Sequence, residues 1–106
     1  MKKLNKQWNG NPLFLYNYGA ELNFIKEYER SIQLLEKCEL YWNNYDVQMI
    51  LADNNFNLER ISASTKYYEL ASNMCPNRYM PLYKLHQVNI NKGDRLKAIY
   101  ILPNKY

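Results

Sequence analysis

Two cysteines and one histidine are the residues of this chain that could form a Cys–His nucleophilic pair. A cysteine nucleophile needs a thiolate with a base in hydrogen-bond reach, so His86 would have to meet Cys38 or Cys75. Cys38 and His86 stand at packing positions of expected helices, where a structural role is the simpler interpretation. Cys75 precedes Pro76 at a helix end, where more exposure is expected. A small enzyme using Cys75 and His86 is therefore the third of three functional hypotheses.

The sequence contains few residues that could bind a metal ion or a cofactor. A single histidine and two cysteines without ligand spacing give too few soft ligands for zinc. Only three glycines are present, which disfavours a glycine-rich phosphate loop. We therefore expect no metal, no cofactor and no enzymatic activity.

The acidic residues have simple structural interpretations. Glu27 and Glu29 flank Tyr28 at an expected helix start, where acids stabilise the helix dipole. Asp53 should project from the first helix of a hairpin, and a solvated surface acid is its simplest interpretation.

The net charge of +4 is unevenly distributed. Lys2, Lys3 and Lys6 lie in a basic leader over residues 1–11, and residues 79–106 are also basic, while residues 12–78 are net acidic. Phosphate-binding faces need clustered bases and stacking aromatic rings. An RNA-binding helical repeat protein is therefore the alternative hypothesis, with nucleic acid the less favoured partner.

Export and membrane segments are not evident in the sequence. The basic start lacks a following apolar stretch of the kind found in signal peptides. No apolar run approaches the ~20 residues that span a bilayer. The chain as it stands is expected in the cytoplasm, with membrane association expected if it is part of a longer protein.

Apolar residues recur at helical spacing along nearly the whole chain. Asn11-Pro12 is a helix start, Lys26-Glu27 a turn, Asn43-Asn44 a break and cap, and Cys75-Pro76-Asn77 a stop. Helices are expected over about residues 12–25, 28–41, 45–57, 59–74, 78–91 and 95–102. No stretch alternates with period two, so strands are not expected.

The chain also matches itself at a shift of about 33 residues, which is typical of stacked helical hairpins. The first unit has Leu15-x2-Tyr18-Gly19-x2-Leu22 and Ser31-x3-Leu35. The second has Gln48-x2-Leu51-Ala52-x2-Asn55 and Ser64-x3-Tyr68. The third has Leu82-x2-Leu85-His86-x2-Asn89 and Ala98-x3-Leu102.

These motifs resemble the tetratricopeptide repeat (TPR), whose unit is about 34 residues long. The resemblance covers residues 12–102 and implies an all-α, right-handed superhelix of about three antiparallel hairpins, the last one short. The expected repeat domain is 12–106, with units at about 12–44, 45–77 and 78–106. Gly19 and Ala52 would let paired helices approach closely, with Leu35 and Tyr68 filling the adjacent space. His86 replaces the small residue in the third unit.

A narrower resemblance rests on the run NPLFLYNYGAELNFIKEYERSIQLLEKC and the later CPNRYMPLYKL. They look like the soluble repeat-bearing tail of O-antigen ligase or polymerase family proteins of Bacteroidetes. That resemblance implies a module of a surface-polysaccharide assembly protein. The chain carries no catalytic loop of such proteins, so no catalytic role follows.

The leading hypothesis is a non-catalytic scaffold that binds a protein or peptide in the concave face of the superhelix. TPR geometry implies that the first helix of each unit lines this face. The expected partner-binding residues are Tyr16, Asn23, Met49, Asp53, Tyr83 and Gln87. Tyr16 and Tyr83 could equally fill space between repeats. The wider lining would add Leu13, Ala20, Asp46, Phe56, Met80 and Ile90.

The third unit is expected to need a cover. Its second helix is short, and end repeats of such stacks need a polar cap. The C-terminal tail, a second copy of the chain, or the remainder of a longer protein would cover the apolar side of residues 79–102. A homodimer through the third repeat is one of these three predictions.

Overall fold

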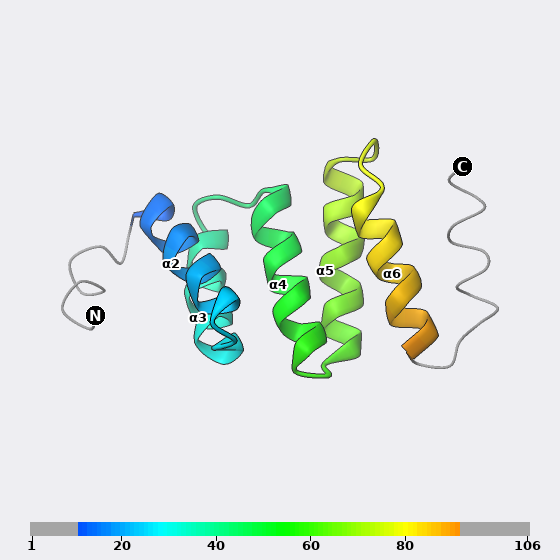
Figure 1. Ribbon diagram of the computed structural model, residues 1–106. Helices are drawn as coiled ribbons and strands as arrows, with labels where there is room; N and C mark the ends of the chain where they lie inside the picture. The colour runs from blue at the N-terminus through cyan, green and yellow to red at the C-terminus, as the bar shows by residue number, and fades with distance from the viewer. Residues whose placement is uncertain (1–10, 92–106) are drawn as a thin grey trace.

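The computed structural model describes residues 11–91 of the chain. All regular structure in this range is helical, and the helices follow one another in sequential hairpins (Figure 1). They are α2 (Pro12–Phe24), α3 (Tyr28–Glu39), α4 (Tyr45–Asn57), α5 (Ile61–Met74) and α6 (Met80–Asn91). The expected all-α hairpin architecture is confirmed. Residues 1–10 of the predicted leader over 1–11, and the predicted helix over 95–102, lie outside the described residues.

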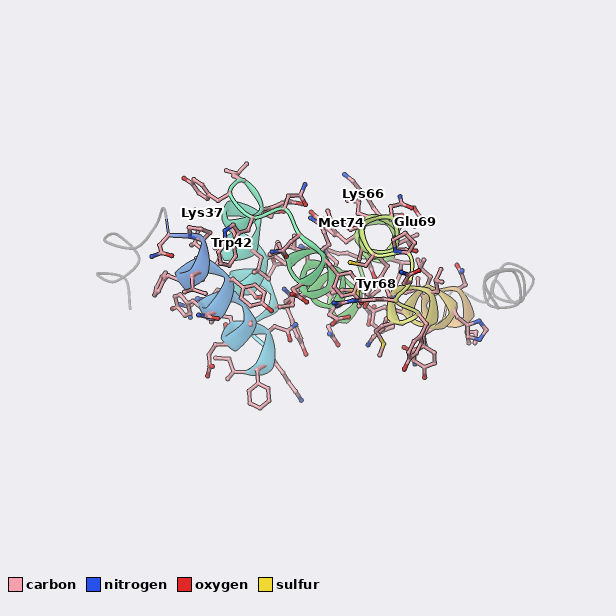
Figure 2. All side chains as sticks on the ribbon, turned by 90° about the horizontal axis from the view of Figure 1, so that it is seen from above. Lys37, Trp42, Lys66, Tyr68, Glu69 and Met74 are labelled. Atoms are coloured by element: carbon pink, nitrogen blue, oxygen red, sulfur yellow. The ribbon has the colours of Figure 1, made fainter. Side chains whose placement is uncertain are left out.

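The helices form two layers. α2 packs on α3, α4 packs on α5, and each hairpin contacts the next through α3 with α4 and α5 with α6. Seen from above, α2, α4 and α6 lie on one side of the stack, with α3 and α5 on the other (Figure 2). We call the surface formed by α2, α4 and α6 the first-helix face.

Asparagine side chains fix two of the helix starts. Asn11 Oδ1 accepts a hydrogen bond from the backbone N–H of Phe14 at 3.2 Å, and Asn44 Oδ1 accepts one from Val47 at 3.0 Å. Each bond satisfies a backbone donor that has no partner within the first helical turn. Both caps were predicted, because capping depends on residues adjacent in the sequence.

The turns that close the first two hairpins have the same backbone conformation. Lys26 and Glu59, which occupy equivalent positions in the two units, have left-handed φ angles of 68° and 62°. The N–H of Glu27 donates to the carbonyl of Leu22, and that of Arg60 to the carbonyl of Asn55, each at 2.8 Å. This is the Schellman arrangement of a helix C-terminus.

The predicted start of α5 near Glu59 is wrong, because Glu59 is the left-handed residue of the turn. A left-handed residue cannot continue a right-handed helix. Because Glu59 is the turn residue, α5 begins two positions later, at Ile61.

Close approach of paired helices is confirmed at Gly19. A Cβ built on Gly19 would lie 2.6 Å from Cγ and 2.7 Å from Cδ2 of Leu35, closer than carbon atoms pack. At the equivalent positions of the second unit, Ala52 and Tyr68 are both fully buried and belong to one cluster with apolar residues of α6. The core thus consists of two clusters, and the partly buried Tyr67 packs against both.

Polar groups differ between the two repeat boundaries. The hydroxyl of Ser31 donates to the Gly19 carbonyl at 2.6 Å and accepts from the Asn54 amide at 2.8 Å, so α2, α3 and α4 are joined. Ser64 is the equivalent serine of the second unit, and its buried hydroxyl has no hydrogen-bond partner among the described residues. In α6 the position that matches Asn54 is Val88, which is fully buried and cannot donate. Only the first boundary therefore has this polar bridge.

Candidate first-helix binding face

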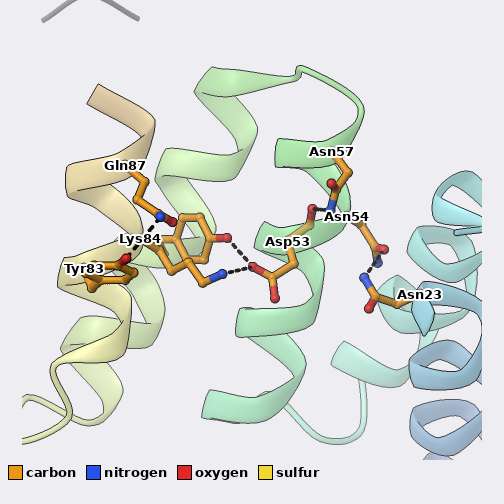
Figure 3. Close-up of polar contacts among 8 residues, drawn as sticks. Asn23, Asp53, Asn54, Asn57, Tyr83, Lys84 and Gln87 are labelled. Atoms are coloured by element: carbon orange, nitrogen blue, oxygen red, sulfur yellow. Dashed lines mark hydrogen bonds and ion pairs between the residues drawn. The ribbon is translucent and has the colours of Figure 1, made fainter. Parts of the chain in front are cut away.

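The predicted partner-binding residues all lie on the first-helix face, two on each helix. Five are half-buried and Tyr83 is exposed, so none is lost in the core. The six residues are Tyr16 and Asn23 on α2, Met49 and Asp53 on α4, and Tyr83 and Gln87 on α6. Figure 3 shows the polar members of this set and their neighbours.

Asn23 is held by the next repeat. Its Nδ2 donates to Oδ1 of Asn54 at 2.8 Å, and Asn54 continues the chain of bonds to Ser31 (Figure 3). Asn54 is completely buried. The sequence offered no signal for it beyond the polar run Asp53-Asn54-Asn55, since its role depends on a contact with the preceding hairpin.

Asp53 joins three helices. Its carboxylate accepts a hydrogen bond from the Tyr68 hydroxyl of α5 and lies 3.8 Å from Nζ of Lys84 in α6 (Figure 3). Burial first, and the Asp53 charge second, raise the pKa of Tyr68 well above its ordinary value of 10.0. The interpretation of Asp53 as a simple solvated acid is therefore wrong. Lys84 was missing from the predicted site, and only its helical position in the third unit could have suggested it.

Tyr83 and Gln87 form the exposed end of the face. Gln87 Nε2 donates to the Tyr83 hydroxyl at 3.3 Å along one side of α6 (Figure 3). The spacing of four residues places the two side chains on the same side of a helix. Tyr83 is exposed and Gln87 half-buried, so the Tyr83 ring is available to a ligand.

Tyr16 and Met49 are more deeply placed. Tyr16 packs against the core of the first repeat pair, and Met49 against the cluster around Tyr68. Burial, then the nearby Asp46 carboxylate, raises the pKa of Tyr16. Two interpretations, partner binding and filling space between repeats, were left open above for Tyr16 and Tyr83. Tyr16 fills space between elements, whereas Tyr83 is exposed.

Apolar groups complete the first-helix face at its ends. Leu13, Met80 and Ile90 are exposed, while Ala20 and Phe56 are half-buried. Asp46 is exposed in the first turn of α4. The opposite layer has a shallow hollow of about 500 Å³ on α3, whose lining is Gln33, Leu34, Glu36, Lys37 and Leu40.

Cys38 lacks the exposure and the lowered pKa that a cysteine nucleophile needs. It is fully buried, its Sγ donates to the Pro12 carbonyl at 3.4 Å, and burial followed by Glu39 raises its pKa. A reactive cysteine needs a lowered pKa. Cys75 follows the last residue of α5, and His86 lies about two turns into α6, half-buried. The packed role expected for Cys38 is confirmed.

Other site classes find no support in the described part of the chain. Residues 11–91 show no group of three or more metal-ligating side chains. Within that range nine acidic residues outnumber seven basic ones, which does not suit a phosphate backbone. No helix there is long and apolar enough to cross a membrane.

Comparison with known proteins identifies the fold. No protein-family model matches the sequence, and curated proteins give no match, so the narrower O-antigen ligase resemblance stays a prediction. The crystal structure of MamA, a TPR protein, superposes with a TM-score of 0.88 at 23% sequence identity. The match covers 98% of this chain and 61% of that one, so this chain spans less than two thirds of the MamA chain. The fold of this protein is that of TPR-like hairpins.

Proposed function

We propose that this chain is a non-catalytic interaction module that binds a peptide segment of a partner protein across the first-helix face. The observation that carries the proposal is the ordered row of polar side chains from Asn23 to Gln87 beside exposed apolar groups. Hydrogen-bonding groups fixed before binding lose little conformational entropy when a ligand arrives.

The amide side chains suit a peptide backbone. An Asn or Gln amide has two N–H donors and a carbonyl with two lone pairs. The bond from Asn23 to Asn54 uses one of the donors of Asn23, and the bond from Gln87 to Tyr83 uses one of the donors of Gln87. The remaining capacity can pair with backbone N–H and C=O groups, as in other forms of peptide recognition.

The exposed apolar groups would supply the side-chain contacts. Tyr83 is 44% and Met80 38% exposed, and both lie on α6. Aromatic rings bury a large area at low entropic cost and are enriched among residues that dominate binding energy. Asp53 and Tyr16 act mainly in holding the face together, so we assign direct contact chiefly to Tyr83, Gln87 and Asn23.

Selection of ligands from a displayed random-peptide library tests the proposal, followed by titration calorimetry of the selected peptides. The double variant Tyr83→Ala and Gln87→Ala should weaken binding about tenfold or more. The matched control is Leu70→Ala, which truncates an exposed side chain on α5 in the other layer. Peptides whose affinity is unchanged by the double variant but reduced by the control would refute the site.

The predicted homodimer through the third repeat remains a separate proposal. Light scattering over a range of concentrations checks it, and a strict monomer at high concentration would exclude a second copy as the cover of α6.

A further inference from the structure

Negative charge predominates on the first-helix face. Its helices α2, α4 and α6 carry three carboxylates and one ammonium, a formal net charge of −2. These groups belong to Glu21, Asp46, Asp53 and Lys84. Lys84 lies beside Asp53 and offsets its charge in part. Glu21 and Asp46 are exposed and form no ion pair in the described part of the chain, so the face attracts cations.

Asp53 has one carboxylate oxygen that a ligand can reach. The Tyr68 hydroxyl and Nζ of Lys84 both contact Oδ1, and both dashed lines in Figure 3 end on that oxygen. Oδ2 accepts no hydrogen bond from the residues that the structure describes. The side chain is 34% exposed, and the hydrogen bond from the fully buried Tyr68 holds it in place. Oδ2 is therefore an acceptor whose position is set before a ligand arrives.

Lys84 does not close this position. Its Nζ lies 3.8 Å from Oδ1, which is longer than a hydrogen bond, and its side chain is 33% exposed. Ion pairs with this exposure contribute little, because water solvates both partners. Lys84 can therefore turn toward solvent when a second cation approaches Oδ2.

An apolar group stands between the two acids of α4. Asp46, Met49 and Asp53 are spaced by three and four residues, which places them along one side of a helix. We call these three residues the acidic strip. Met49 is half-buried. Lysine and arginine pack their aliphatic stems on apolar groups while the charged end stays in polar surroundings, and the strip provides both environments.

The charge of the strip selects the charge of the partner. A peptide rich in acids, or one held by its C-terminal carboxylate, would meet like charge at Asp46 and Asp53, which opposes association. We propose that the segment bound on the first-helix face is basic. One of its lysine or arginine side chains donates to Asp53 Oδ2 and packs its stem on Met49, while Asp46 adds attraction at longer range. This inference rests on the peptide-binding function proposed above and specifies the partner.

Three displayed peptide libraries test the inference. They are identical except for one fixed central residue, which is lysine, alanine or glutamate. The lysine library should yield the tightest peptides. In calorimetry, replacing the fixed lysine of a selected peptide with alanine should weaken binding about tenfold, the usual effect of a hydrogen bond to a charged group. Added salt should weaken the lysine peptide more than its alanine counterpart.

Matched double variants locate the contact. Asp46→Asn with Asp53→Asn should weaken the lysine peptide about tenfold or more and leave the alanine peptide unchanged. Asparagine keeps an oxygen that can accept from Tyr68, so the fold should persist, and circular dichroism checks this. The control, Glu36→Gln with Glu69→Gln, removes two exposed acids from the other layer and should change affinity by less than about twofold.

The outcomes separate this inference from the peptide-binding function. Tightest binding by alanine or glutamate peptides that still depend on Tyr83 and Gln87 would keep the function and overturn the basic partner. Equal weakening of lysine and alanine peptides by the aspartate changes would show that these acids act only through the structure, which also overturns it. If no peptide from any library binds, both proposals are wrong.

Discussion

The side-chain amide of Asn54 in α4 donates to the hydroxyl of Ser31 in α3 at 2.8 Å, and this bond joins the first two repeats. Ser31 in turn donates to the Gly19 carbonyl of α2 at 2.6 Å. The second repeat boundary keeps the serine, as Ser64, but has Val88 where the amide would stand.

Because of this difference, we expect the same Ser→Ala substitution to change the free energy of unfolding by different amounts in the two repeats. Ser31→Ala removes a buried partner of Asn54 and should lower the free energy of unfolding by about 1–3 kcal/mol. Ser64→Ala removes a hydroxyl that has no partner within residues 11–91 and should change it by less than ~0.5 kcal/mol, or raise it. Urea unfolding monitored by circular dichroism measures both, and equal losses would contradict the account.

Gly19→Ala should be destabilising, although alanine normally stabilises a helix interior by about 1 kcal/mol relative to glycine. The new Cβ would meet Leu35 at 2.6 Å, and overpacking of this kind costs about 1–3 kcal/mol. The double variant Gly19→Ala with Leu35→Ala should lose less than the sum of the two single losses. Additive losses in a double-mutant cycle would show that the two side chains do not clash.

The alkaline limit of stability should depend on Tyr68. Burial and Asp53 raise its folded-state pKa far above the unfolded value of 10.0. Above about pH 10 the unfolded chain then releases the proton first, so stability present at neutral pH is lost as the pH rises. Tyr68→Phe should lower stability at neutral pH by about 1–3 kcal/mol through the lost bond to Asp53.

The same variant tests the pH dependence. Thermal unfolding from neutral pH to pH 11 should show a shallower alkaline decline in Tyr68→Phe than in the parent chain. Tyr83→Phe is the matched control, because Tyr83 is exposed and its substitution should leave the slope unchanged. Parallel declines in all three proteins would assign the alkaline loss to other groups.

We expect one substitution at Gln48 to be nearly neutral for the stability of the fold. It is fully buried where the other units have Leu15 and Leu82, and its Oε1 has no partner among the described residues. Gln48→Met keeps the shape and removes the unpaired carbonyl. It also removes the bonds that Nε2 donates to Glu39 and Asn43, but Glu39 is half-buried and Asn43 exposed, so water can replace the lost donor. The free energy of unfolding should therefore change by less than ~1 kcal/mol.

Gln48→Glu is the informative contrast. Gln48 Nε2 donates to Glu39 Oε2 at 2.6 Å and to Asn43 Oδ1 at 2.8 Å. A second carboxylate beside Glu39 should lower stability by about 2 kcal/mol or more at neutral pH, with partial recovery in acid. Calorimetric unfolding at several pH values measures this, and a large loss for Gln48→Met would refute the argument.

The sequence was sufficient for features that depend on neighbours or on helical period. Asn11 and Asn44 are caps because of the residues next to them, and Gly19 and Leu35 were paired through the repeat. The sequence was insufficient where a side chain acts across a hairpin boundary. The bond of Asn54 to Ser31 and the approach of Lys84 to Asp53 depend on how one unit is oriented on the next, which no local pattern specifies.

The left-handed turns at Lys26 and Glu59 have a consequence for how this chain is compared with others. A lysine and a glutamate share no side-chain chemistry, yet both adopt a φ that glycine would reach without strain. Equivalent positions of the two repeats therefore agree more closely in backbone torsion angles than in residue type. A search for related chains by torsion-angle pattern should find members that residue similarity overlooks.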